Sequence, residues 1–315
     1  MSIDIHDFQH LSLLLGIKKE ELAKIVNGNT YFYREFVIPK RKKGQFRIIS
    51  SPLPILKYCQ DWIKINILDS IGVNSHAYAY KKGVSIVDNV IIHLNTTEFY
   101  KIDLENFFGS IPFRRVMKVF LNCGYSKNVS YFLSNLCTLK NQLPQGASTS
   151  PSLSNIISKR LDKRISKLSY LTKINYSRYS DDLSFSGEKI PITFQHLVKK
   201  IILEEGFTLN KKKEIYVNGI NKKKIITGIS ISNGEELKLP RVYKRNLKLE
   251  IFKYLKYDFK ISITSDNFDP LIGDRLLGKL HFWKQIEKEN QLVENYIDKV
   301  RAKNESLNYD LAKLT

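Results

Sequence analysis

Cysteine is scarce in this chain, and long apolar runs are missing from it. The three cysteines, Cys59, Cys123 and Cys137, are too scattered for a zinc knuckle, and an odd number argues against a disulfide framework. No apolar run approaches the ~20 residues that span a bilayer, and the N-terminus lacks the pattern of a secretion signal. These absences exclude a disulfide scaffold and a membrane-spanning protein, and they predict a soluble, cytoplasmic one.

Acidic residues are also few relative to basic ones. Lys and Arg together number 51 against 31 for Asp and Glu, which gives a formal net charge of +20 and a pI near 9.6. Such a charge favours a polyanionic partner, most often a nucleic acid. A Lys-rich surface that merely solvates the protein would give the same excess, so charge alone leaves both interpretations open.

The order of predicted elements indicates an α+β fold. The chain has 315 residues, enough for two or three subdomains around a substantial core. Helical periodicity covers 1–28, 55–70, 112–122, 127–138, 151–168, 191–205 and most of the chain from 241 onward. Strand patterns cover 31–38, 46–49, 99–103, 207–209 and 214–217, and 223–231 with 235–239 resembles a hairpin. Strands therefore dominate the middle and helices the C-terminal third.

A basic turn separates the first two predicted strands. Lys40-Arg41-Lys42-Lys43-Gly44 lies between them, and Pro52 and Pro54 end the second strand. We expect the two strands and this turn to form a basic flap that binds phosphates. An ordinary hairpin with a solvated turn is the alternative.

Tyr179-Ser180-Asp181-Asp182 places two adjacent carboxylates between apolar and β-prone residues. This pattern predicts a β-hairpin with the acids at its tip. Neighbouring acids repel each other unless a cation or proton neutralises them, and a divalent metal ion is a common reason to tolerate the pair. The alternative is a solvated turn without a bound ion, because Ser and Asp favour turns.

Asp103 supplies a further carboxylate from a distant part of the chain. It ends the predicted strand at 99–103, so Asp103 and Asp181 both lie at strand ends within one plausible sheet. That placement suits phosphoryl transfer with two metal ions. Mg²⁺ is the expected ion, since it prefers hard oxygen ligands together with substrate phosphates.

Three motifs in order resemble those of reverse transcriptases. The segment Leu143-Pro144-Gln145-Gly146, continuing to Pro151, resembles the family's Pro-Gln-Gly element and lies between Asp103 and the Tyr-x-Asp-Asp string. Two further segments resemble signatures of bacterial retron reverse transcriptases. Asn89-Val90-Ile91-Ile92-His93 departs from Asn-Ala-x-x-His at Val90, and Ile226-Thr227-Gly228 is similar to Val-Thr-Gly. The resemblance covers most of 30–285.

The resemblance implies a right-hand polymerase fold. N-terminal helices and fingers would occupy 1–98. The palm, an antiparallel sheet with helices, would occupy 99–232, with a finger insertion around 112–150. A helical thumb would occupy 233–315, and Gly278-Lys279-Leu280-His281-Phe282 looks like a thumb segment of this family.

The resemblance also implies a metal site. Asp103 and Asp181 would bind both of two Mg²⁺ ions. Asp182 would lie beside them, and the Leu104 carbonyl would be a possible backbone ligand.

For the incoming nucleotide, the resemblance implies contacts from several segments. Phe108 would be the steric gate that selects dNTPs, although a core aromatic fits it too. Gln145 would contact the nucleotide, and Arg47 with Lys43 would clamp its triphosphate. Lys213, or its neighbour Lys212, would lie near the leaving pyrophosphate, unless the Lys triplet is only a solvated turn.

A basic stripe is expected in the C-terminal third. Arg241, Lys244, Arg245 and Lys248 share one helix face, with Val242, Leu249 and Phe252 placed to pack elsewhere on that helix. The stripe could follow a duplex backbone or be a solvated face. Asn89 and His93 could bind nucleic acid or form a packed, hydrogen-bonded pair.

The function implied is that of an RNA-dependent DNA polymerase of the retron type. It would use dNTPs, bind its own noncoding RNA, start from a guanosine 2′-hydroxyl and leave branched RNA-linked DNA. A separate effector protein and a role in antiphage defence would accompany it. A group II intron-like or diversity-generating reverse transcriptase is the near alternative. An inactive RNA-binding scaffold would not need the three acids, and Phe108 argues against an RNA-dependent RNA polymerase.

Overall fold

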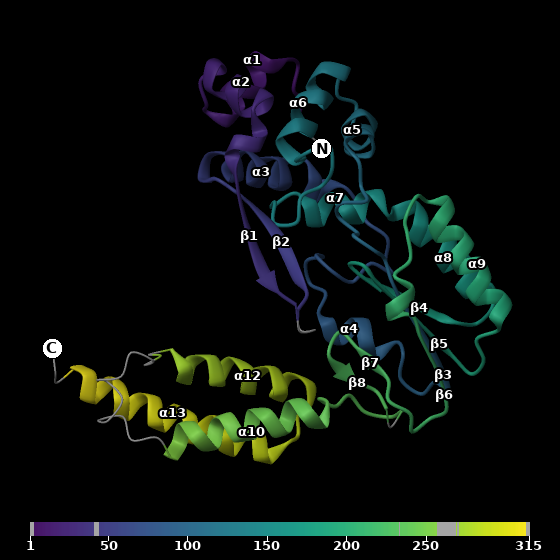
Figure 1. Cartoon of the computed structure of the whole chain (residues 1–315), viewed down its shortest axis with the longest axis vertical. Coiled ribbons are helices and arrows are strands. Elements are labelled where there is room, and N and C mark those ends of the chain that lie inside the picture. Colours follow the sequence, from purple (N-terminus) through teal and green to yellow (C-terminus); the bar gives the residue numbers. More distant parts are fainter. Residues whose placement is uncertain (1–2, 41–43, 233, 257–268, 270, 313–315) are drawn as a thin grey trace. The chain divides into compact units, whose positions relative to one another are not determined.

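The computed structural model describes residues 3–40, 44–232, 234–256, 269 and 271–312 (Figure 1). The chain forms two compact units. The first unit comprises Met1–Asn89 and Glu98–Tyr216, and the second comprises Val90–Thr97 and Val217–Thr315. The three regions expected from the sequence, with boundaries after residues 98 and 232, stay a prediction.

Short helices pack together at the start of the first unit. α1 (Phe8–Leu15) begins at the cap Asp7 and ends at Gly16, whose φ of 64° is left-handed; α2 (Lys19–Asn27) follows. The expected single helical stretch over 1–28 is therefore two helices, because Gly16 turns the chain. They contact α6 (Lys127–Cys137), which also packs on α3 (Pro54–Asn66) and α5 (Phe113–Asn122).

The expected flap is an antiparallel hairpin. β1 (Tyr33–Pro39) pairs with β2 (Phe46–Pro52), from Tyr33 opposite Pro52 to Pro39 opposite Phe46. Apolar side chains on both strands are exposed near its free end, among them Val37, Phe46 and Ile48. Lys43 lies outside the described residues.

A four-stranded sheet forms the centre of the first unit. Its order is β4-β5-β3-β6, built from β4 (Asn175–Tyr179), β5 (Asp182–Gly187), β3 (Glu98–Asp103) and β6 (Ile215–Asn218). Tyr100 and Tyr176 both lie opposite Phe185, and the three rings stack. Burial of these aromatic side chains fixes the register of β3 and β4 against β5. In this register the end of β3 lies beside the start of β5.

Helices pack against this sheet. α8 (Lys159–Leu171) contacts β4 and α9 (Ile192–Glu204) (Figure 1). α7 (Ser150–Ile157) precedes α8 and is separated from it at Ser158. The helix expected over 151–168 is thus two helices rather than one.

The second unit contains a tight hairpin and long helices. β7 (Ile225–Ile226) and β8 (Ile229–Ser230) are joined by Thr227-Gly228, both with positive φ. The hairpin expected between 223–231 and 235–239 therefore turns earlier, and 238 adds only a bridge to Ser230. The last two residues of α4 (Ile86–Ile91) begin the 90–97 segment, whose Thr96 and Thr97 carbonyls accept bonds from buried Lys224.

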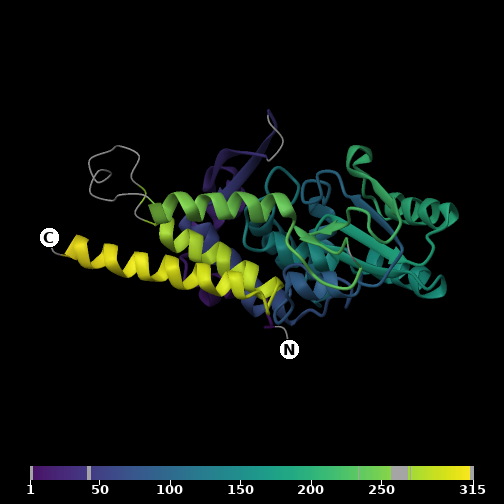
Figure 2. The same ribbon diagram turned by 90° about the horizontal axis from the view of Figure 1, so that it is seen from below.

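Three helices of the second unit pack together: α10 (Arg241–Lys256), α12 (Ile272–Ile286) and α13 (Gln291–Ala312) (Figure 2). α10 buries Leu247, Ile251 and Tyr254. The expectation that Val242, Leu249 and Phe252 pack is wrong, because all three are more than half exposed. No helix within the described residues is long and apolar enough to cross a membrane.

Candidate active site

The fold brings the three predicted acids to one edge of the central sheet. Asp103, the last residue of β3, lies directly opposite Asp182, the first residue of β5. Asp181 lies in the two-residue turn between β4 and β5. The Leu104 amide donates to the Asp181 carbonyl at 2.9 Å, so the two motifs are joined through the backbone.

The turn that carries Asp181 has an unusual first residue. Ser180 has a φ of 61°, in the left-handed region where glycine is favoured, whereas Asp181 does not. The Ser180 carbonyl accepts from Arg178 Nη1 at 3.0 Å, and its Oγ accepts from the Tyr80 hydroxyl at 3.1 Å. These two bonds to a buried residue hold the turn in this conformation.

Two lysines partly compensate the acids. Lys213 Nζ lies 2.7 Å from Asp103 Oδ2, and Lys101 Nζ lies 2.8 Å from Asp182 Oδ2. Burial, followed by the charges of Asp182 and Asp103, raises the pKa of Asp181. Burial works against the charged form of Lys213, yet the bond to Asp103 and the neighbouring acids raise its pKa, so it carries a proton at neutral pH.

The carboxylates fit a divalent cation by chemistry. They are hard oxygen donors, and the pKa of Asp181 is raised first by burial and then by the neighbouring carboxylates, both of which a bound cation would offset. Across the described ranges no group of three or more His, Cys, Asp or Glu side chains is arranged to hold a metal ion. Asp103 and Asp182 instead each have one oxygen in contact with a lysine. A bound cation would replace these lysine contacts.

Phe108, the predicted steric gate, is half-buried beside this edge. Its ring centroid lies 5.5 Å from that of Phe107 and 6.4 Å from that of Tyr80. It therefore packs against the hydrophobic core while part of the ring stays accessible. The side chain has both the partial exposure that a gate needs and the packing of a core aromatic.

The Gln145-Gly146 segment is held against strand β2. The Ser50 amide donates to the Gln145 carbonyl at 2.8 Å. Gly146 has a φ of 132°, and a Cβ there would lie 2.6 Å from the Ser50 carbonyl oxygen. Only glycine permits this approach. Arg47 lies on the same strand, with an exposed side chain, opposite Ile38.

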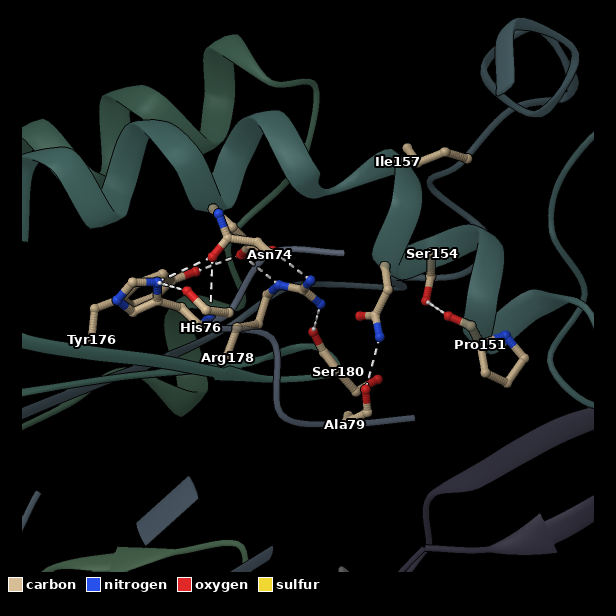
Figure 3. Close-up of polar contacts among 12 residues, drawn as sticks. Asn74, His76, Ala79, Pro151, Ser154, Ile157, Tyr176, Arg178 and Ser180 are labelled. Atoms are coloured by element: carbon tan, nitrogen blue, oxygen red, sulfur yellow. Dashed lines mark hydrogen bonds and ion pairs between the residues drawn. The ribbon is translucent and has the colours of Figure 1, made fainter. Parts of the chain in front are cut away.

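A buried ion pair next to the turn that carries Asp181 could not be predicted from the sequence motifs. Arg178 and Asp162 are both fully buried. Arg178 Nε and Nη2 donate to the two carboxylate oxygens at 2.8 and 2.7 Å, and the Tyr176 hydroxyl donates to the same carboxylate at 2.8 Å. Figure 3 shows the Arg178 guanidinium also reaching Ser180. Burial opposes its charge, but Asp162 raises the pKa of Arg178, which therefore stays protonated.

One sequence signal could have revealed this pair. Tyr176 and Arg178 are two residues apart on β4 and so lie on one face of the sheet. A charged residue inside such a buried face needs a buried partner. The sequence does not say which acid supplies it, because Asp162 comes from a helix.

The residues predicted to bind nucleic acid lie in different settings. Arg241, Arg245 and Lys248 are exposed on α10. Lys244 instead pairs with Glu287 at 3.0 Å, and the ammonium groups of both Lys244 and Lys248 lie over the Trp283 ring.

Asn89 and His93 are both buried. The side-chain amide atoms of Asn89 have no hydrogen-bond partner among the described residues. Burial lowers the pKa of His93 to about 3.

A cavity of about 580 Å³ lies within the second unit, lined by residues that include Ile91, Leu94 and Glu287. The three acids are not in its lining, so chemistry rather than cavity size locates the candidate active site.

Comparison with known proteins agrees with the motifs. The family model described as reverse transcriptase (RNA-dependent DNA polymerase) matches residues 38–255. The retron Ec86 reverse transcriptase of Escherichia coli is 31% identical over 251 residues, covering 79% of this chain and 77% of that protein. The retron Ec83 reverse transcriptase of the same species is 32% identical over 272 residues, covering 82% and 86%.

The chain is also similar to a retron reverse transcriptase of another species and to a telomerase. The retron Mx162 reverse transcriptase of Myxococcus xanthus is 30% identical over 253 residues, covering 70% of this chain and 52% of that protein. Among solved structures, telomerase from Candida albicans with a telomeric RNA fragment matches with a TM-score of 0.47 and 14% identity, covering 87% of this chain and 61% of that one.

Proposed function

The chain belongs to the reverse transcriptase family and, within it, to the bacterial retron reverse transcriptases, and from this premise we propose what it synthesises. It is an RNA-directed DNA polymerase with the right-hand polymerase fold. We infer that it copies part of its own noncoding RNA, starts from a guanosine 2′-hydroxyl, and leaves single-stranded DNA branched from that RNA. The kinship with retron enzymes supports this product.

Asp103 and Asp181 carry the proposed chemistry. The family uses divalent metal, and we propose two Mg²⁺ ions held by Asp103 and Asp181, with Asp182 and the Leu104 carbonyl beside them. Bound ions would supply activation of the primer hydroxyl and stabilisation of the leaving pyrophosphate. The placement of Asp103 opposite Asp182, with Asp181 in the adjoining turn, is the observation that supports the assignment.

The remaining residues would bind and orient the nucleotide. Lys213, protonated at neutral pH and 2.7 Å from Asp103, would neutralise or protonate the leaving pyrophosphate. Phe108 would exclude the 2′-hydroxyl of a ribonucleotide, Gln145 would contact the nucleotide, and Arg47 with Lys43 would clamp its triphosphate. The exposed Arg241, Arg245 and Lys248 would follow the template–primer backbone, whereas Lys244 is engaged with Glu287.

We further propose a separate effector protein as partner, a cytoplasmic location and a role in antiphage defence. These follow from kinship alone.

The test of the proposal uses purified protein, dNTPs, Mg²⁺ and the structured noncoding RNA that the proposal expects to be encoded beside the gene. We expect labelled DNA that stays attached to RNA and that a 2′–5′ debranching enzyme releases. Attachment that resists debranching would contradict 2′-hydroxyl priming. DNA made on any primed template but never on the structured RNA would favour a group II intron-like or diversity-generating lineage.

A further inference from the structure

Tyr80 lies at the candidate active site, although the sequence motifs do not include it. The segment before it runs beside β4 in the first unit. The Arg178 amide donates to the His76 carbonyl at 2.8 Å, and the Tyr78 amide donates to the Arg178 carbonyl at 2.9 Å. These bonds form a parallel bridge between Ala77 and Arg178, so this segment extends the central sheet past β4.

Ala79, the residue before Tyr80, is held by a hydrogen bond from helix α7. Asn155 of α7 donates from Nδ2 to the Ala79 carbonyl at 2.7 Å, a bond drawn in Figure 3 near the Arg178–Ser180 contact. Ala79 and Asn155 are both buried. The path of the chain is therefore fixed up to the residue that follows.

Tyr80 itself has a strained backbone. Its φ of 60° is left-handed, which is rare for a bulky side chain and is found mostly where a function requires it. The conformation directs the side chain to the catalytic turn, where the hydroxyl donates to Ser180 Oγ at 3.1 Å. The ring centroid lies 6.4 Å from that of Phe108, and the residue is 50% exposed.

The charges around the Tyr80 hydroxyl are those of the proposed substrate site. Burial raises its pKa, the bond to Ser180 lowers it, the charge of Asp181 raises it, and Arg47 lowers it. The net shift is upward, so the hydroxyl stays protonated and donates. Tyr80 thus lies within electrostatic reach of both the metal-binding turn and the proposed triphosphate clamp.

We propose that Tyr80 is a specificity-determining residue of the nucleotide site. Its exposed ring and Phe108 together form the wall against the sugar of an incoming deoxyribonucleoside triphosphate, and its hydroxyl holds the Ser180 turn that positions Asp181. This inference rests on the proposed assignment of Phe108 to the nucleotide site. It assigns two separable roles, one to the ring and one to the hydroxyl.

Single-nucleotide incorporation on an oligo(dT)-primed poly(rA) template, with dUTP or UTP, which differ only in the 2′-hydroxyl, separates these roles. Tyr80→Ala should lower the ratio of kcat/KM for dUTP to that for UTP by about tenfold, the scale of a lost pocket contact. Tyr80→Phe should keep that ratio but lower kcat. Ser180→Ala should also keep the ratio and lower kcat, and the double variant Tyr80→Phe with Ser180→Ala should have no lower kcat than the single variants. Tyr170→Ala, at a tyrosine 85% exposed on α8, serves as the control.

Phe108→Ala distinguishes failure of this inference from failure of the nucleotide site. An unchanged ratio in Tyr80→Ala, with a lowered ratio in Phe108→Ala, would overturn the role of the Tyr80 ring and leave the site standing. An unchanged ratio in both would overturn both assignments. A wild-type kcat in Tyr80→Phe would overturn the role of the hydroxyl. If thermal melting shows that Tyr80→Ala does not fold, Tyr80→Leu replaces it in the same comparison.

Discussion

At the scale of single residues, the site depends on charges that are incompletely balanced. Within the described part of the chain, Asp103 and Asp182 each have a lysine partner, whereas Asp181 has no ion pair of its own. The turn that carries Asp181 is held through Ser180 by Arg178 and Tyr80. Asp181 is thus kept in place by the Leu104 amide and by the neighbours of Ser180, and its carboxylate is left for the cation that we propose.

His93 gives the fold a predictable response to acid. Its folded pKa is about 3, against about 6.5 in the unfolded chain. Above pH 6.5 both states are neutral and His93 contributes no pH dependence. Below that pH only the unfolded state gains the proton, so the free energy of unfolding should fall, by up to about 1.4 kcal/mol per pH unit, until pH nears 3. Urea unfolding followed by Trp283 fluorescence, in a Trp62→Phe background, measures this slope.

His93→Gln should flatten that response between pH 6.5 and 5. His196→Gln, at an exposed position on α9, should leave it unchanged. A slope in His93→Gln equal to that of the parent would show that His93 is not the group responsible.

At the scale of elements, the β4–β5 hairpin depends on the buried Asp162–Arg178 pair. Removing one partner leaves a buried charge without compensation, so Asp162→Asn should lower the free energy of unfolding by about 3–5 kcal/mol. Replacing both, as Asp162→Leu with Arg178→Met, should restore much of that stability, because it removes both buried charges. The double variant should still polymerise at least tenfold more slowly than wild type, since the Ser180 carbonyl has lost its donor.

Denaturant melts and dNTP incorporation rates on one set of preparations test this pair. Full recovery of both stability and rate in the double variant would mean that the ion pair supports only folding, not the geometry of the turn.

The contact between the Gln145-Gly146 segment and β2 is also testable. Gly146→Ala puts a Cβ 2.6 Å from the Ser50 carbonyl oxygen, so the segment must shift and the KM for dNTP should rise. Gly124→Ala is a matched control, because its φ of 93° carries similar strain while a Cβ there meets nothing within 4 Å. Equal KM values in the two variants would contradict the proposed contact of Gln145 with the nucleotide.

Local patterns predicted the elements better than their ends or their partners. The strand at 99–103 and the Asp-Asp hairpin were foreseeable, because alternation and turn residues encode them locally. The break at Ser158 depends on how α7 and α8 pack, and the exposed Val242, Leu249 and Phe252 depend on which face of α10 meets its neighbours. Tyr80 and Asp162 could not be found from spacing, because tertiary contacts alone bring them to the turn.

At the scale of the whole molecule, the net charge of +20 predicts strong dependence of RNA binding on salt. Each phosphate contact that is lost should reduce the slope of log K against log salt by about 0.9. Arg245→Ala combined with Lys248→Ala, exposed on α10, should therefore reduce it by about 2. Lys163→Ala on α8 is the control. Fluorescence anisotropy with a labelled RNA–DNA duplex across a salt series gives the slopes, and an unchanged slope in the α10 variant would remove α10 from the interface.

The proposed activity depends on the three acids acting as a polymerase site. The most direct measurement is the rate of dTTP incorporation on oligo(dT)-primed poly(rA) with Mg²⁺, for wild type, Asp103→Asn and Asp181→Asn, with Asp298→Asn as an exposed acid on α13 for comparison. We predict a loss of at least about 100-fold in the first two variants, with melting temperatures at or above that of wild type, and no loss in the third. A wild-type rate of incorporation by Asp181→Asn or Asp103→Asn would contradict the assignment of these acids to the polymerase site.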